Sequence, residues 1–530
     1  MTLSPLRLAI LEASAADINL KAIKRGVEKE SLRINPNGTL AQSPHSPLLG
    51  SALTHPHITT DFSEALLEFI TAPSSNIEQT LTQLDQIHRF TYANLGNELL
   101  WVNSMPCALP KDDDIPVAVY GSSHVAQMKT NYRLGLGHRY GRLMQTIAGI
   151  HFNFSLPNEF WRYLKAQDQD TSDLKDYRTQ GYLHLIRNFR RYFWLLLYLF
   201  GASPAVCPTF VQGRKHNLSP FGREGKSLYG PHATSLRMGD LGYQSKAQQS
   251  ISINYNSLPD YLVALCNAIT QSHPDYEKIG IHDENGHYRQ LNTGILQIEN
   301  EFYSTVRPKR TSKRGETALS ALFHRGIEYV EVRCVDLNPF IPLGIDQEQI
   351  RFLDTFLLYC ALADSPLADK DENKRVQENQ QRMVYKGRDP SLKLVSRDQE
   401  RSFKEWAKHI LAQLEPIASL LDQSSTSNDY QLALNRQIEK VEDASLVPSA
   451  KVLATMEEKD QSFFEFALSL AEQHNQHFRQ NPLDSTEKQR FEAFAKESLA
   501  NQAKIESEDT GDFETYLRDF YAQYSYCGSC

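Results

Sequence analysis

A carboxylate and a guanidinium lie two residues apart in the stretch RGIEYVEVRCVDLNPF, residues 325–340. On a β-strand, successive side chains point to opposite faces, so Tyr329, Glu331 and Arg333 share one face and the other face is apolar. The stretch RGVEKESLRI, residues 25–34, places two carboxylates on one strand face in the same way. Taken singly, each row is best interpreted as solvated surface, and an exposed ion pair contributes little to stability.

The same pattern recurs, which favours a functional interpretation. Glu28 and Glu30 form the carboxylate pair of the first stretch. In QTIAGIHFNFSLP, His151 shares its face with other polar groups opposite an apolar row, and a ligand role and a structural hydrogen bond are about equally favoured. A fourth row is predicted in ILQIENEFY, residues 295–303. The basic cluster VRPKR that follows it suits phosphate oxygens, with a solvated basic turn as the alternative.

A further group of acids lies in DFSEALLEFI, residues 61–70, where the spacing predicts a helix. Asp61, Glu64 and Glu68 fall on one helical stripe at i, i+3 and i+7, beside an apolar stripe. Asp61 and Glu64 resemble a capping box, which gives both a local role. Glu68 has no such role, so it is the member of this group that most needs a functional explanation.

Composition limits the class of protein. The 530 residues are 41% hydrophobic and 23% charged, which indicates a soluble globular protein with a large core. The net charge of −8 argues against a nucleic-acid partner, and the strongest apolar run, residues 192–202, is too short to span a membrane and predicts a buried helix. Seven cysteines do not make a dense disulfide framework. With no secretion signal at the amino terminus, they predict a cytoplasmic protein.

Strands with one apolar and one functional face must be positioned by a common sheet. They predict an antiparallel or mixed sheet with helices on its apolar side and one concavity lined by the functional faces. Helices are also predicted at residues 177–200 and 347–363, and residues 128–140 form a helix or a turn. From about residue 402 the pattern is amphipathic and helical. Many carboxylates with one imidazole suit Mg²⁺ or Mn²⁺ rather than zinc, and an adjacent guanidinium suits phosphoryl transfer.

Six motifs, in order, carry a family resemblance: GVEKESLR, SALTHPHITTDFSEALLEFIT, GIHFNFSLP, FGASPAVC, LQIENEFYSTVRPKR and GIEYVEVRCVDLNPF. They resemble glutamate–cysteine ligases (gamma-glutamylcysteine synthetases) of the gamma-proteobacterial type 1 family, over residues of about 20 to 365. The resemblance implies an α+β fold related to glutamine synthetase, with a mainly antiparallel sheet whose concave face carries the active site. It also implies a catalytic domain over residues 1–400, with a helical region over 401–530 packed on it.

The implied reaction joins the γ-carboxylate of L-glutamate to the amine of L-cysteine through a γ-glutamyl phosphate. ATP is the co-substrate, Mg²⁺ or Mn²⁺ the cofactor, and glutathione the expected feedback inhibitor. Another amine acceptor, or a catalytically silent protein that binds metal or nucleotide, remains an alternative. The terminal CGSC, with Cys527 and Cys530, lacks the other ligands of a zinc site and predicts an oxidisable tail.

The resemblance also assigns roles to individual residues. The implied metal ligands are Glu28, Glu30, Asp61, Glu68, His151 and Glu331. Arg333 would hold the transferred phosphoryl group and, with Glu331, form the catalytic pair. The implied cysteine pocket consists of Phe62, Tyr132, Gln145, Tyr243 and Tyr303, and Arg237 would hold a substrate carboxylate.

Overall fold

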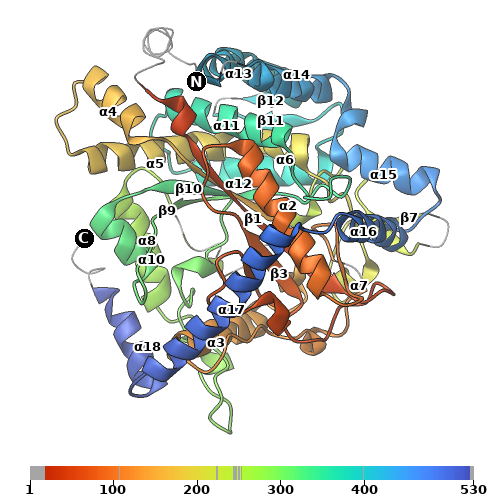
Figure 1. The fold of residues 1–530 in the computed structure, drawn as a ribbon. Coiled ribbons are helices and arrows are strands. Elements are labelled where there is room, and N and C mark those ends of the chain that lie inside the picture. The colour runs from red at the N-terminus through yellow and green to blue at the C-terminus, as the bar shows by residue number, and fades with distance from the viewer. Residues whose placement is uncertain are drawn as a thin grey trace.

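A seven-stranded sheet runs through the middle of the molecule in the computed structural model (Figure 1). The structure describes residues 18–525 except 107, 223–224, 243–246, 249–250, 252, 398 and 426. The strand order is β2-β3-β1-β5-β10-β9, with β4 also paired to β1, and every pairing is antiparallel. The strands are β1 (Lys24–Ile34), β2 (Ile58–Thr60), β3 (Leu66–Ile70), β4 (Leu99–Leu100), β5 (Ile150–Ser155), β9 (Val306–Lys309) and β10 (Tyr329–Val335). The predicted antiparallel sheet is confirmed.

Three of the predicted strands occur where the alternation placed them, as β1, β5 and β10. The fourth, at residues 295–303, is wrong. There the chain makes a 3₁₀ turn, η7 (Glu299–Glu301), because Oε2 of Glu301 accepts the backbone N–H of Gln297 at 2.6 Å. The other oxygen of Glu301 binds Arg139 at 3.0 Å and the Tyr140 hydroxyl at 2.6 Å. The polar side chain of Glu301 therefore binds other parts of the protein and does not line a sheet face.

The predicted helix at residues 61–70 is also wrong. Residues 61–65 form a turn in which the Leu66 N–H binds the Ser63 carbonyl, and the chain then continues as strand β3. Leu67 and Phe69 are buried, and β3 pairs with β1 along its whole length. A short apolar run fits a strand as well as a helix, and the hydrogen bonds offered by β1 decide between them. Glu64 is no capping residue, since its carboxylate accepts backbone N–H groups of two other loops.

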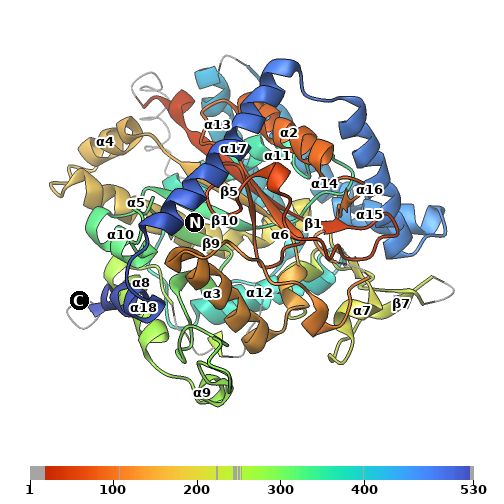
Figure 2. The ribbon, with the colours of Figure 1, turned by 60° about the horizontal axis from the view of Figure 1, so that its bottom comes forward.

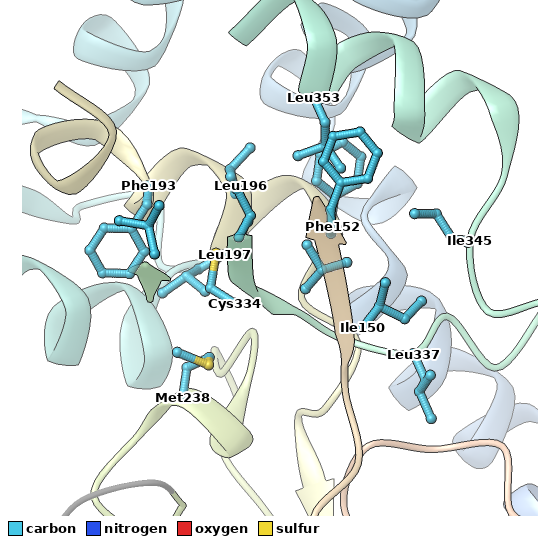
Figure 3. Close-up of a cluster of buried hydrophobic side chains, with 14 of the residues drawn as sticks. Ile150, Phe152, Phe193, Leu196, Leu197, Met238, Cys334, Leu337, Ile345 and Leu353 are labelled. Carbon is cyan, nitrogen blue, oxygen red and sulfur yellow. The ribbon is translucent and has the colours of Figure 1, made fainter. Parts of the chain in front are cut away.

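Helices cover the apolar face of the sheet. They are α2 (Ile77–Asn94), α5 (Leu174–Tyr192), α6 (Trp194–Phe200) and α11 (Gln347–Leu362). Every residue of α6 is buried, which confirms the predicted buried helix. Figure 3 shows Leu196 and Leu197 of α6, with Leu353 of α11, gathered around Phe152 of β5 and Cys334 of β10. This packing fixes the face of each strand that is left for chemistry.

The C-terminal region is helical, as predicted. It contains α13 (Phe403–Ser425), α14 (Asp429–Glu442), α15 (Pro448–Glu458), α16 (Phe463–Gln480), α17 (Ser485–Glu508) and α18 (Phe513–Ala522). Helices α13 and α14 pack on α11, α16 packs on α2, and α17 crosses the molecule towards α18, which lies beside α3 (His124–Tyr140) (Figure 2). The helix option for residues 128–140 is thus confirmed by α3. The division at residue 400 stays a prediction.

The remaining elements form smaller layers around this frame. They are α4 (Asn158–Gln167), α7 (Pro208–Val211), α8 (Leu258–Thr270), α9 (Pro274–Ile279), α10 (Ala318–Arg325), α12 (Glu372–Lys386), β6 (Ala205–Val206), β7 (Ser219–Phe221), β8 (Ser227–Tyr229), β11 (Lys393–Val395) and β12 (Glu400–Ser402). Among the described helices, none is both long and apolar enough to cross a membrane.

The four cysteines in the described part of the chain fall into two groups. Cys207 and Cys266 each take part in a disulfide bond, whereas Cys334 and Cys360 are buried free thiols. The predictions for the terminal CGSC and for the amino terminus concern residues outside those that the structure describes.

Candidate active site

Sheet register brings the acidic rows of separate strands together. Glu28 of β1 lies opposite His151 of β5, and Glu30 lies opposite Glu68 of β3. On the far side of β5, Glu331 of β10 lies opposite Asn153. Because these residues share the face that the covering helices leave free, the side chains converge on one patch.

His151 lies at the centre of this patch. Its Nδ1 atom is 3.1 Å from Oε2 of Glu28 and 3.4 Å from Oε1 of Glu331, and its Nε2 atom is 3.5 Å from Oε1 of Glu30. One ligand atom each of Glu28, His151 and Glu331 lies within 4.8 Å of the others. The sequence rows therefore meet in space, and the oxygen-rich donor set suits a hard divalent cation.

Glu68 and Asp61 extend the acidic patch. Burial raises the pKa of Glu68 well above its usual value, and the nearby charges of Glu28, Asp61 and Glu30 raise it further. The turn that replaces the predicted helix still leaves Asp61 close to these carboxylates. Carboxylates crowded in this way repel one another, so a bound cation would stabilise their ionised forms.

Glu331 is the carboxylate with cationic neighbours. Its Oε1 atom accepts a hydrogen bond from Arg333 at 3.0 Å, and Lys309 Nζ lies 3.3 Å from its Oε2 atom. Burial opposes ionisation of Glu331, but Lys309 and Arg333 together hold its pKa well below the usual range. Oε2 accepts no hydrogen bond from a described residue. An ionised carboxylate, with one oxygen that pairs with the Lys309 ammonium but accepts no hydrogen bond from the described residues, fits a metal ligand.

The backbone and an amide orient the other acids. Asn153 donates from Nδ2 to Oε1 of Glu28 at 2.8 Å, and the Gly149 N–H donates to Oε2 of Glu30 at 2.7 Å. A Cβ atom on Gly149 would lie 2.0 Å from Nη2 of Arg237, so this position has no space for a side chain. Protein contacts thus fix at least one oxygen of Glu28 and of Glu30.

Arg237 lies beside this patch and is buried. It donates from Nη2 to the Arg333 carbonyl at 2.9 Å, and its Nη1 atom is 3.7 Å from Oδ1 of Asp336. Burial raises the pKa of Glu30, and the positive charge of Arg237 opposes this rise. Arg237 is therefore positioned by protein contacts at the edge of the acidic patch.

The residues assigned to the cysteine pocket gather around α3 and the turn η4 (Met144–Thr146). Gln145 donates from Nε2 to the Tyr303 hydroxyl at 3.0 Å. Burial raises the pKa of Tyr132, and Tyr303 is among the neighbours that add to it. The buried Phe62 ring lies close to Gly137 of α3. Tyr243 lies outside the described residues.

The side chains of the predicted basic cluster VRPKR point in different directions in the structure. Lys309 reaches Glu331, whereas Arg307 donates to the Asn300 carbonyl at 2.8 Å. Arg310 turns away and donates to the Arg325 carbonyl at 3.1 Å. Only part of the cluster therefore faces the acidic patch.

Two cations, Lys129 and Arg133, lie beside Asp61 and Glu68, and the sequence pattern does not predict a role for them. Lys129 Nζ and Arg133 Cζ each lie 4.6 Å from the centre of the Tyr120 ring. Burial, together with the neighbouring Arg133, lowers the pKa of Lys129 to about 8. Glycines at residues 135 and 137 obscured the helix that carries both cations, and Tyr120 lies in a segment without periodicity.

Comparison with known proteins gives a consistent result. The model of the family described as glutamate-cysteine ligase matches residues 8–383. The glutamate–cysteine ligase of Alcanivorax borkumensis is 52% identical over 97% of this chain and 98% of its own, and that of Saccharophagus degradans is 49% identical over 96% of each.

A solved structure agrees with the sequence matches. The crystal structure of glutamate–cysteine ligase from Francisella tularensis in complex with AMP superposes with a TM-score of 0.89 at 36% identity, covering 95% of this chain and 98% of the other. Sequence, fold and the convergence of acids on one sheet face agree, and the chain belongs to the glutamate–cysteine ligase family.

Proposed function

We propose that the acidic patch activates the γ-carboxylate of L-glutamate with ATP and joins it to the amine of L-cysteine. The observation that carries the proposal is the convergence of Glu28, His151 and Glu331 beside Arg333. A carboxylate is a poor acyl donor because its oxygen is a poor leaving group and its charge repels nucleophiles. Phosphorylation of the carboxylate removes both obstacles.

The donor set supports a divalent-cation site formed by the six ligands named above: Glu28, Glu30, Asp61, Glu68, His151 and Glu331. Mg²⁺ or Mn²⁺ bound there would neutralise charge on the phosphates of ATP. In this proposal, Asn153 and the Gly149 N–H hold the carboxylates of Glu28 and Glu30 in place. Lys309 keeps Glu331 ionised.

Arg333 is proposed to hold the phosphoryl group in transfer. A guanidinium has planar, paired donors that match two phosphate oxygens, which gives it a role that lysine does not reproduce. Glu331 orients it, since Nη1 of Arg333 donates to Oε1 of Glu331 at 3.0 Å. Arg237 is proposed to bind a carboxylate of the substrate from the edge of the patch.

The pocket around Tyr303 is proposed to hold cysteine while its amine attacks the acyl phosphate. The attack forms the amide bond and releases phosphate, and the amine proton leaves to solvent. Phe62, Tyr132 and Gln145 are proposed to line this pocket. Glutathione contains the γ-glutamylcysteine unit, so it is proposed to compete for the same pocket. The thiol substrate fits a reducing compartment, and we place the protein in the cytoplasm.

The test is release of ADP from ATP and glutamate in the presence of Mg²⁺, with cysteine, 2-aminobutyrate or ammonium as acceptor. We expect release that requires Mg²⁺ and is fastest with cysteine or 2-aminobutyrate. Faster release with ammonium would identify a ligase with another acceptor. No release with any acceptor would overturn the proposal.

A further inference from the structure

A cavity of about 280 Å³ lies on the helical side of the molecule, away from the acidic patch. Its walls come from α5, α11, α12 and α13, from the strands β11 and β12, and from Pro366, Ser396 and Arg397. Helix α5 packs on β10, and α11 packs on α5. Because the cavity opens behind these helices, it is separate from the sheet face that carries Glu28 and Glu331, and it is independent of the function proposed above.

Guanidinium groups surround the mouth of this cavity. Nη2 of Arg375 and Nη2 of Arg397 lie 2.7 Å and 3.2 Å from the same oxygen, Oδ2 of Asp369. Arg401 forms no ion pair with a carboxylate in the described part of the chain, and its Cζ atom lies 5.7 Å from the Trp406 ring centre. Arg375 and Arg397 thus share one carboxylate, while Glu372, which also lines the cavity, pairs with Arg191 at 2.9 Å. The mouth therefore has guanidinium donors left for an anion.

Two phenols line the cavity more deeply. The Tyr192 side chain is 5% exposed and that of Tyr359 is 1% exposed. Neither hydroxyl has a hydrogen-bond partner within the described residues. Both hydroxyls can therefore form hydrogen bonds with a polar group that enters the cavity. Val376, Val395 and Ile410 supply apolar walls.

We infer that this cavity binds a small organic anion with an apolar body. Its carboxylate or phosphate group lies among Arg375, Arg397 and Arg401, its apolar body lies against the wall, and a polar end reaches Tyr192 and Tyr359. The volume is just below the range of roughly 300–1,000 Å³ of sites for drug-sized ligands, so the ligand is small.

The experiment uses the whole chain with saturating Mg²⁺ and ADP, so that the nucleotide site is filled. Calorimetric titrations use three probes: 4-hydroxyphenylacetate, phenylacetate and phenyl phosphate. We expect binding of at least one probe, with a Kd below about 10 mM. A preference for phenyl phosphate over phenylacetate would identify a phosphate ligand, and the reverse a carboxylate ligand.

Two variants test the assigned contacts. Arg401→Gln should weaken binding by about tenfold or more, which is about 1.4 kcal/mol. The matched control is Arg382→Gln on α12, whose guanidinium pairs with Glu378 and Glu400 and does not line the cavity. Tyr192→Phe should weaken the binding of 4-hydroxyphenylacetate more than the binding of phenylacetate.

Arg401 is exposed, so its substitution should leave the urea unfolding curve unchanged. A loss of binding in Arg401→Gln can then be attributed to the lost contact and not to unfolding. The inference is overturned if none of the probes produces binding heat with the unmodified protein. It is equally overturned if Arg401→Gln and Arg382→Gln bind a probe with the same affinity as the unmodified protein.

Discussion

The guanidinium of Arg25 donates from Nε to Oδ2 of Asp354 at 2.8 Å, joining the central strand β1 to α11. Arg25 is 3% exposed and Asp354 is 0% exposed. Nη2 of Arg25 also donates to the hydroxyl of Tyr430 on α14 at 3.1 Å. Along β1, Arg25 points to the helices, whereas Glu28 points to the acidic patch. One strand therefore carries a structural ion pair on one face and a functional carboxylate on the other.

Removing one member of this pair should destabilise the protein strongly. Asp354→Asn leaves the Arg25 charge buried without its counter-ion, which lowers the free energy of unfolding by about 3–5 kcal/mol. Urea unfolding measures the change. The control is Asp85→Asn, which removes a partly exposed pair with Arg89 and should change the free energy by less than about 1 kcal/mol. Equal effects of the two substitutions would contradict the structural role of the buried pair.

Divalent cations should stabilise the folded chain. If Mg²⁺ binds the acidic patch only in the folded state, a concentration of 100 times Kd adds about 2.7 kcal/mol to the free energy of unfolding. The melting temperature should therefore be higher in Mg²⁺ than in EDTA. Glu28→Gln should remove most of this rise, and Glu378→Gln on α12, whose carboxylate pairs with Arg382, should keep it. A rise of the same size in Glu28→Gln would place the bound cation elsewhere.

The strands of the site could be predicted where apolar and polar side chains alternate over many residues and one face of the strand is wholly apolar. In β5, the buried Phe152 and Phe154 alternate with polar side chains over the whole strand. The alternation also correctly placed Glu28 and Glu30 on one face. The resemblance then supplied roles that alternation cannot give, since it does not distinguish a ligand from a solvated acid.

The two wrong predictions share a physical cause. Leu66 to Ile70 is too short a run for its period to separate helix from strand, and pairing with β1 decided its form. In residues 295–303 the alternation is present, but Glu301 binds Arg139 from a distant helix. Contacts between residues far apart in the chain are absent from a local pattern.

Arg333→Lys should lower turnover without unfolding the protein. Lysine keeps the charge but offers one ammonium in place of paired planar donors, so we expect a loss in kcat of about a hundredfold. The Arg333 side chain is partly exposed, and its urea unfolding midpoint should stay close to that of the unmodified protein. Arg310→Lys is the control, since Arg310 turns away from the site. Near-normal turnover of a folded Arg333→Lys enzyme would contradict a paired contact with phosphate.

Lowering the pH should reduce the free energy of unfolding, because protonation of His55 is unfavourable in the folded state. Its Nδ1 atom accepts the backbone N–H groups of His57 at 3.1 Å and Ile58 at 2.9 Å, so the ring must be neutral with its proton on Nε2. Burial, together with the neighbouring His57 and His45, lowers the pKa of His55 from 6.5 to about 4.

The sign of the pH effect follows from these values. Between pH 6.5 and about 4, the unfolded chain binds a proton at His55 that the folded chain does not, so stability is complete above pH 6.5 and is lost as the pH falls. Between pH 6.5 and 5, the loss from this group reaches up to about 2 kcal/mol. His55→Asn offers an amide oxygen that accepts similar hydrogen bonds without titrating. Urea unfolding at both pH values should show a smaller loss in His55→Asn than in the exposed control His409→Asn, and equal losses would rule out His55 as the source.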